Sequence, residues 1–409
     1  MTQPLLQAAD LRGAARLTTE AVAGLTSLVE AMHARIASLP YLATPGSPPP
    51  EERTRGVTGL VYKTVRGVTH VVGGSAEALL GWLGPALLAP QQPHQAPRAD
   101  REAIVAALNG VLGDHLAATD NPLAIPMAFR HAGLPLSLER FDLRARLPGT
   151  TPHLLVLLHG LCMNDLQWQR AGHDHGAALA RELGFTPVYL HYNTGLSIST
   201  NGRILAQQME RLFDAWPVPI ERITLLGHSM GGLVARSALH HAPAIQRGAL
   251  RWPSRVTDVV CLGSPHLGAP LERAGHGVDI LLGAAPYAAP LARLGKLRSA
   301  GIRDLRWGNI VSGHAGDEGT APSAPVALPS SARCFAIAGD LGPAGRSGGL
   351  KARLVGDGLV TVDSALGRHA QATRGLSFPA AHRAVVHETG HLDLLSSAEV
   401  AGLLLRWLK

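Results

Sequence analysis

Hydrophobic positions from about residue 123 onward alternate between two patterns. Short, nearly continuous apolar runs are typical of strands buried in a parallel sheet, and apolar residues that recur every three or four positions are typical of helices. These patterns predict strands at 127–131, 138–147, 154–158, 187–192, 222–226, 256–262, 333–338 and 383–387. They predict helices at 175–183, 202–216, 231–241 and 397–408. The alternation indicates an α/β fold with a mostly parallel, doubly wound sheet, in which ligands bind beyond the carboxyl ends of the strands.

The first part of the chain has only the helical pattern. Segments 5–39, 57–88 and 99–116 repeat apolar residues with a helical period, and proline-rich links separate them. We therefore expect a helical extension over residues 1–122, followed by a catalytic domain over 123–409. Three roles are open for the extension: packing on the catalytic domain, which we favour, covering its mouth, or peripheral contact with a membrane or lipid surface.

A long insertion interrupts the strand and helix alternation between residues 270 and 328. It contains apolar segments of helical character at about 278–282, 286–297 and 302–307. Long insertions at the carboxyl ends of strands often form lids over active sites, so this one predicts a helical cap.

The most specific motif is Gly227-His228-Ser229-Met230-Gly231, which follows the apolar run of the strand at 222–226 and precedes the helix at 231–241. In this Gly-x-Ser-x-Gly context, a sharp strand-to-helix turn exposes the serine hydroxyl, and the small glycines avoid collisions with neighbouring backbone. The motif predicts Ser229 as a nucleophile.

Two backbone amides are candidates for an oxyanion hole. Met230 follows the nucleophile, and Leu161 lies in the loop His159-Gly160-Leu161-Cys162 after the strand at 154–158. Enzymes with this motif take one donor from each of these two places, and the loss of one such donor raises the barrier by about 3 kcal/mol. We interpret His159 as a structural residue that fixes the loop.

A serine hydroxyl needs a base and an orienting carboxylate, which in this arrangement follow the serine in the order acid, then histidine. Asp357 lies between two glycines in a tight loop and is the predicted acid, with Asp340 as the alternative. Asp363 is interpreted as a turn or capping residue. His391, in the loop after the last strand, is the predicted base, whereas His387 lies on the strand itself.

Composition narrows the remaining choices. The net charge of +7 comes mostly from scattered arginines rather than a basic block, so we expect no nucleic-acid partner. Three cysteines without metal-binding spacing predict free thiols in a reducing compartment. Because the start lacks a signal-peptide pattern, we expect a cytoplasmic protein, with peripheral membrane association left open. His173 and His175 lack a third ligand, so neither a metal nor another cofactor is expected.

Taken together, these motifs resemble the α/β-hydrolase superfamily, and within it the bacterial lipase and esterase group, which includes triacylglycerol lipases and inositol-deacylase-like hydrolases. Gly-Ser-Pro-His-Leu-Gly-Ala-Pro at 263–270 and the loops around Asp357 and His391 extend the resemblance beyond the elbow, from about residue 126 to the end. It implies an α/β-hydrolase fold with Ser229 as nucleophile, Asp357 as acid and His391 as base.

The sequence thus predicts a serine carboxylic-ester hydrolase that forms an acyl-enzyme on hydrophobic esters, lipids or polyesters. Two alternatives are open: an acyltransferase or thioesterase with the same triad, and a non-catalytic binding protein on a hydrolase fold. Acyl-chain length, the alcohol moiety and the oligomeric state have no signal in the sequence.

Overall fold

The computed structural model describes residues 11–19, 99–245, 250–269, 299–311, 326–344 and 356–409. Its contacts divide the chain into two compact units, one of Met1–Pro93 with Ala118–Leu123 and one of His94–Ala117 with Ala124–Lys409. The helix at 99–116 thus groups with the sheet, so this division differs from the predicted boundary at residue 122. The rest of the predicted N-terminal helices, except residues 11–19, and most of the predicted cap lie outside the described residues.

In the first unit, residues 11–19 are helical. The side-chain amide of Asn121 donates to the Gly13 carbonyl at 3.1 Å, and the Asn121 side-chain oxygen accepts from the Leu123 amide at 3.0 Å. A Cβ on Gly13 would lie 2.5 Å from a Leu123 side-chain carbon, so the helix needs a residue without a side chain at this contact.

The second unit is built on one sheet of the order β2-β1-β4-β3-β5-β6-β7-β8. From β3 to β8 all neighbouring strands are parallel, and β1 pairs antiparallel with both β2 and β4. The strands are β1 Ala128–His131, β2 Leu134–Pro135, β3 His153–Leu158, β4 Thr186–His191, β5 Arg222–His228, β6 Val256–Leu262, β7 Arg333–Asp340 and β8 Arg383–His387. This order confirms the predicted α/β fold with a mostly parallel sheet.

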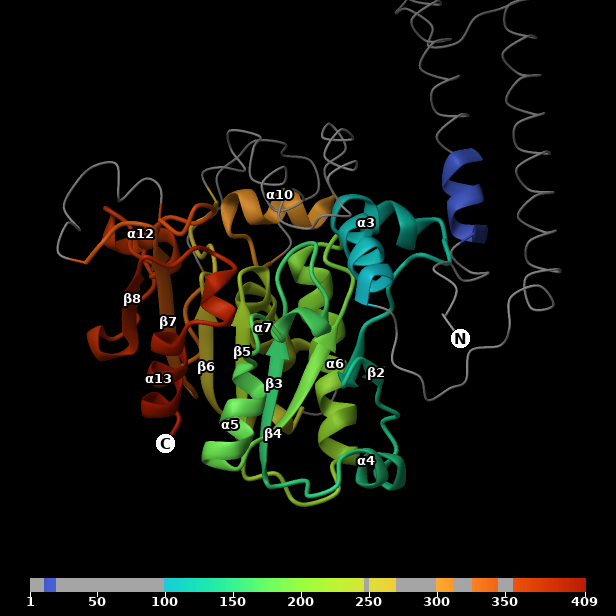
Figure 1. Ribbon diagram of the computed structural model, residues 1–409, viewed down its shortest axis with the longest axis horizontal. Helices are drawn as coiled ribbons and strands as arrows, with labels where there is room; N and C mark the ends of the chain where they lie inside the picture. Colours follow the sequence, from blue (N-terminus) through green and yellow to red (C-terminus); the bar gives the residue numbers. More distant parts are fainter. Residues whose placement is uncertain (1–10, 20–98, 246–249, 270–298, 312–325, 345–355) are drawn as a thin grey trace, which may run out of the picture. The chain divides into compact units, whose positions relative to one another are not determined.

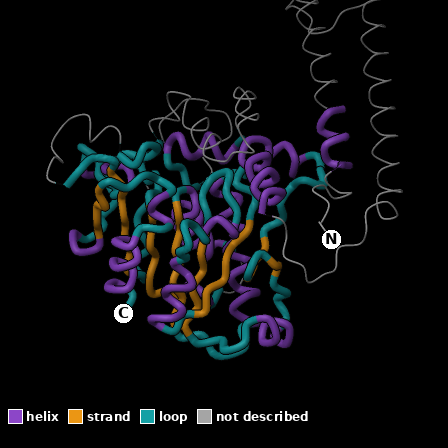
Figure 2. Tube along the Cα trace, in the orientation of Figure 1, coloured by secondary structure: helices purple, strands orange, loops and turns teal. Residues whose placement is uncertain are grey.

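Helices cover both faces of the sheet (Figures 1 and 2). The helices are α3 Ala99–Ala118, α4 Arg140–Arg146, α5 His175–Leu183, α6 Ile198–Ala215, α7 Met230–His241, α10 Ala300–Trp307, α12 Val362–Ala365 and α13 Ala398–Trp407. α5 and α13 pack together over one core cluster, and α6 packs along α7 over the other side of β5.

Strand residues alternate between these two cores. Leu155 and Leu157 of β3 belong to the cluster that includes Leu179 of α5 and Leu404 of α13. All of β3 from Leu154 to Leu158 is buried, as expected for a strand covered on both sides. Two-sided burial explains why the central strands have continuous apolar runs in the sequence.

One predicted element is wrong. The segment 138–147, expected as a strand, contains helix α4. The amides of Leu143 and Leu147 donate to the carbonyls of Glu139 and Leu143, and both leucines are buried, whereas Phe141 is 84% exposed. The apolar period is therefore four residues, as in a helix, and the alternation through Phe141 was misleading.

The carboxyl ends of the strands meet along one edge of the sheet. In Figure 1, α3, α10 and α12 lie along the edge toward which β3 points. The predicted site residues all lie in the segments that follow β3, β5, β7 and β8 at this edge.

Candidate active site

Ser229 occupies the turn between β5 and α7. Its backbone has φ 54° and ψ −120°, a conformation that residues with a side chain rarely adopt. A Cβ on Gly231 would overlap the Leu158 carbonyl, and one on Gly227 would overlap the Gly232 amide. The flanking glycines thus let helix, strand and turn approach closely enough to hold the serine in a strained position, which is common at functional sites.

Two neighbouring strands fix the position of Ser229. Its amide donates to the Leu262 carbonyl of β6 at 2.8 Å. On the β3 side, a Cβ on Gly160 would lie 3.1 Å from the Ser229 Cβ, so the loop after β3 passes directly beside the serine. The absence of a side chain at Gly160 therefore leaves room for the serine and for a group bound to it.

Leu161 and Met230 lie on the two sides of this serine. Leu161 follows Gly160 in the loop after β3, and Met230 is the first residue of α7. Among the residues that the structure describes, no hydrogen-bond acceptor is found for the amide of either residue. The first amides of a helix have no acceptor within the helix, so the Met230 N–H can bind a developing negative charge.

His391 and Asp357 form a buried pair in the loops after β8 and β7. His391 Nδ1 lies 2.7 Å from Asp357 Oδ2. The other carboxylate oxygen, Oδ1, accepts from the amides of Leu359 at 3.0 Å and Val360 at 2.8 Å. An ionised carboxylate only accepts hydrogen bonds, so Nδ1 is the donor and the lone pair of Nε2 is left for a proton.

His228 links the serine to this pair. Its ring lies 4.7 Å from the His391 ring between centroids, and its Nε2 lies 3.0 Å from the His391 carbonyl oxygen. Burial, reinforced by the nearby His391, holds the pKa of His228 well below its usual value, so this ring stays neutral. His228, which precedes Ser229 in the chain, thus contacts His391, the partner of Asp357.

Gly263, which follows β6, lies close to the pair of His391 and Asp357. Its φ is 57°, and a Cβ there would lie 3.1 Å from Asp357 Oδ2 and 3.2 Å from His391 Cε1. Any larger residue would press on the pair. In the sequence this glycine stands out only as part of the motif at 263–270, and its packing against the pair has no local signal.

The alternative acids lie elsewhere. Asp340, at the end of β7, pairs with His387 at the end of β8, with Oδ2 and Nδ1 3.2 Å apart. Asp363 lies in the first turn of α12. The structure therefore brings Asp357, and not Asp340 or Asp363, to His391.

The other histidines singled out from the sequence have local partners. His159 is buried, stacks on Tyr192 at 4.4 Å between centroids, and its Nδ1 lies 3.0 Å from the Gly160 carbonyl. Burial lowers the pKa of His159 to about 3. His173 Nε2 contacts His175 Nδ1 at 2.8 Å. Within the described ranges no three side chains of the metal-binding types are grouped to hold a metal ion.

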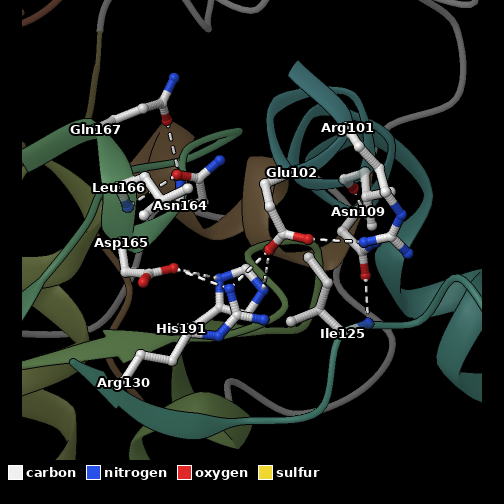
Figure 3. A network of polar contacts seen from close by, with 11 residues as sticks. Arg101, Glu102, Asn109, Ile125, Arg130, Asn164, Asp165, Leu166, Gln167 and His191 are labelled. Atoms are coloured by element: carbon white, nitrogen blue, oxygen red, sulfur yellow. Dashed lines mark hydrogen bonds and ion pairs between the residues drawn. The ribbon is translucent and has the colours of Figure 1, made fainter. Parts of the chain in front are cut away.

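Two further features lie at this edge, a helix expected from the sequence at about 302–307, which is α10, and a charge cluster that the sequence did not predict. Helix α10 lies beside the serine loop, since a Cβ on Gly301 would lie 3.2 Å from the Met230 Cε atom. A cluster of buried charges also lies beside the loop after β3 (Figure 3). Its members come from four segments far apart in the sequence, so no local pattern could have predicted them.

One segment of the chain matches a known family model. Residues 151–286 match the family model described as PGAP1-like alpha/beta domain. No match is found among curated proteins. In the described parts of the chain, no helix is long and apolar enough to cross a membrane.

Several solved structures are similar. The mature form of Bacillus licheniformis lipase BlEst2 has 18% identity and a TM-score of 0.41, over 69% of this chain and 98% of the lipase. Lipase 1 from Pelosinus fermentans has 13% identity and a TM-score of 0.37, over 63% and 97% of the two chains. The Pyrococcus furiosus esterase Pf2001 has 14% identity and a TM-score of 0.35, over 63% and 85%.

The sheet order and the strained serine turn between β5 and α7 are those of an α/β-hydrolase fold. The match to the PGAP1-like family model covers residues 151–286 of this fold.

Proposed function

We propose that Ser229, His391 and Asp357 form the catalytic triad of a carboxylic-ester hydrolase. The observation that carries the proposal is the buried 2.7 Å pair of His391 and Asp357, which is joined through His228 to the strained turn at Ser229. A neutral imidazole oriented by a carboxylate is the base that a serine nucleophile requires.

In the proposed reaction, His391 Nε2 takes the hydroxyl proton as Ser229 Oγ attacks the ester carbonyl carbon. The amides of Leu161 and Met230 donate to the resulting oxyanion, and Asp357 stabilises the imidazolium. His391 then returns the proton to the departing alcohol, which leaves an acyl group on Ser229. A water molecule, deprotonated by His391, releases the acid in the same way.

The proposed substrates are hydrophobic esters, including lipids and polyesters with medium or long acyl chains. The basis is the apolar composition of the insertion at 270–328, which includes Leu281, Leu282, Leu291, Leu294 and Trp307. Of these, only Trp307 lies within the described residues, at the end of α10. An apolar cover over the serine would favour long acyl chains because it removes their surface from water.

The test is a series of p-nitrophenyl esters from acetyl to palmitoyl, hydrolysed by the wild type and by Ser229→Ala. We expect turnover that falls at least about 10³-fold in the variant, with an optimum at medium or long chains. Turnover that survives in Ser229→Ala would overturn the mechanism. Release of product only after an alcohol or thiol is added would indicate acyl transfer instead of hydrolysis.

Cytoplasmic location and peripheral membrane contact through residues 1–122 stay predictions. Sedimentation of the full chain with anionic and with neutral phospholipid vesicles tests the second. We expect the positively charged chain to prefer the anionic vesicles if it contacts lipid, and absence of co-sedimentation with both would exclude this contact.

A further inference from the structure

We propose that a buried charge network of Glu102, Arg130, Asp165 and His191 positions the loop after β3 that carries the Leu161 amide. This inference rests on the proposed function, in which that amide stabilises the oxyanion. The four residues come from α3, β1, the short helix at Asp165–Trp168, and β4, and they converge beside the loop (Figure 3).

Arg130 lies at the centre of the network. Its Nη1 lies 2.7 Å from Glu102 Oε2 and 3.1 Å from Asp165 Oδ1. Both ring nitrogens of His191 face the same two carboxylates, with Nδ1 3.3 Å from Asp165 Oδ1 and Nε2 3.8 Å from Glu102 Oε2. Asp165 therefore has two basic partners, and its pKa is lowered by His191 and Arg130, against the raising effect of burial.

Asp165 belongs to the same compact loop as Leu161. The Met163 amide donates to the Gly160 carbonyl at 3.3 Å. Asn164 caps the short helix that contains Asp165. Its side-chain oxygen accepts from the Leu166 amide, and its own backbone amide donates to the Gln167 side-chain oxygen. A displacement of Asp165 is therefore transmitted over few residues to Leu161, which lies four positions earlier.

Neighbouring segments hold the other side of the loop. The Tyr192 hydroxyl donates to the His159 carbonyl at 2.7 Å, and the Cys162 amide donates to Thr194 Oγ1 at 3.2 Å. On the side of α3, a Cβ on Gly110 would overlap Cys162 Sγ. The loop thus packs against α3, the helix that supplies Glu102.

Charge pairs of this kind are a costly way to stabilise a fold. Removing charged groups from water costs free energy that their attraction often only balances, and apolar residues of similar size can replace them without loss of stability. Their fixed hydrogen-bond geometry is better suited to orientation. An oxyanion donor needs such orientation, because it acts only when it lies at about 2.7–3.1 Å from the charge that develops.

The chain contains a matched control at the other end of the sheet. Asp258, near the start of β6, is fully buried and pairs with Arg222 Nη2 at 2.7 Å and with Arg333 Nη2 at 2.6 Å. Like Asp165, it is a buried carboxylate with two basic partners. The active-site loops leave the opposite ends of the strands, so Asp258 shares the structural role of Asp165 and not the proposed positioning role.

The experiment compares Asp165→Asn with Asp258→Asn in the full chain, with ester turnover expressed per mole of folded protein. We expect Asp165→Asn to lower kcat about 10- to 100-fold with KM changed less than about threefold, because the oxyanion forms only in the transition state. The pH at which kcat/KM reaches half its plateau should not move. Asp258→Asn should keep kcat within about twofold of the wild type.

Equal kcat in Asp165→Asn and Asp258→Asn would overturn the inference. So would a loss in Asp165→Asn that appears only as a higher KM. If Asp165→Asn does not fold, Arg130→Lys is the deciding variant, because it keeps the positive charge and loses the planar guanidinium. A lower kcat at constant KM in this variant supports the inference. A kcat equal to that of the wild type overturns it. Turnover that persists in Ser229→Ala would instead overturn the proposed function, so the two failures are distinguishable.

Discussion

Asp357 and His391 are joined twice. Their side chains meet through Nδ1 and Oδ2 at 2.7 Å, and the His391 amide donates to the Asp357 carbonyl at 2.9 Å. The backbone bond fixes the distance between the two loops independently of the side chains. As a result, the loops after β7 and β8 hold the imidazole in one orientation, which is the preorganisation that the proposed general base would need.

The choice of Asp357 over Asp340 as the acid can be tested directly. We expect Asp357→Asn to lower kcat about 10³- to 10⁴-fold, because the amide can no longer hold the Nδ1–H tautomer or stabilise an imidazolium. Asp340→Asn is the matched control, since Asp340 pairs with His387 and its Oδ1 accepts from the Gly342 amide at 3.0 Å. It should lose less than about tenfold in the same assay. A larger loss in Asp340→Asn than in Asp357→Asn would reverse the assignment.

The close approach at Gly231 should make this position intolerant of a methyl group. We expect Gly231→Ala to lower the free energy of unfolding by about 2–3 kcal/mol, because the new Cβ would overlap the backbone carbonyl of Leu158. Gly149→Ala is the control. Its φ is 80° with no atom within 4 Å of the added Cβ, so only backbone strain of about 1 kcal/mol is expected. Urea unfolding of both variants checks the difference, and equal losses would contradict the packing argument.

The free energy of unfolding should decrease as the pH falls below the usual pKa of histidine, because the native chain buries a histidine in its neutral form. Burial lowers the pKa of His175 to about 4, so between pH 6.5 and 4 the unfolded chain takes up a proton at this residue and the native chain does not. Stability therefore decreases as the pH falls through this range, by roughly 3 kcal/mol for this histidine. Urea unfolding at several pH values measures the decrease.

The control for this effect is His175→Gln. The histidine Nε2 lies 2.9 Å from the Leu394 carbonyl oxygen, and a glutamine amide can keep that bond without titrating. The variant should therefore lose less stability than the wild type between pH 6.5 and 4. An unchanged pH dependence would show that His175 does not contribute to it.

The sequence predicted the central strands and the elbow well because each is determined locally. The apolar runs of β3 and β5 reflect burial on both faces, and the turn at Ser229 needs its neighbouring glycines within five positions. α4 was mistaken for a strand because Phe141 adds an apolar residue that the fold leaves exposed. Short amphipathic segments of this kind fit both periods.

The contacts that complete the site could not be predicted in this way. Gly263 contacts Asp357 and His391 across more than ninety positions, and the network around Arg130 joins four segments. Only the sheet order brings these residues together. The chemistry of single residues could therefore be inferred from sequence, whereas the arrangement that positions them required the folded chain.

The proposed mechanism requires that Ser229 becomes acylated. Peptide mass mapping after reaction with a fluorophosphonate measures this directly. An activated serine oxygen attacks the phosphorus of this reagent as it would attack the carbonyl carbon of an ester, and the serine becomes phosphonylated. We expect one adduct, on the peptide that contains Ser229, and a much slower reaction in His391→Ala. An adduct on another serine, such as Ser264 in the loop after β6, or ester turnover that continues after full labelling of Ser229, would contradict it.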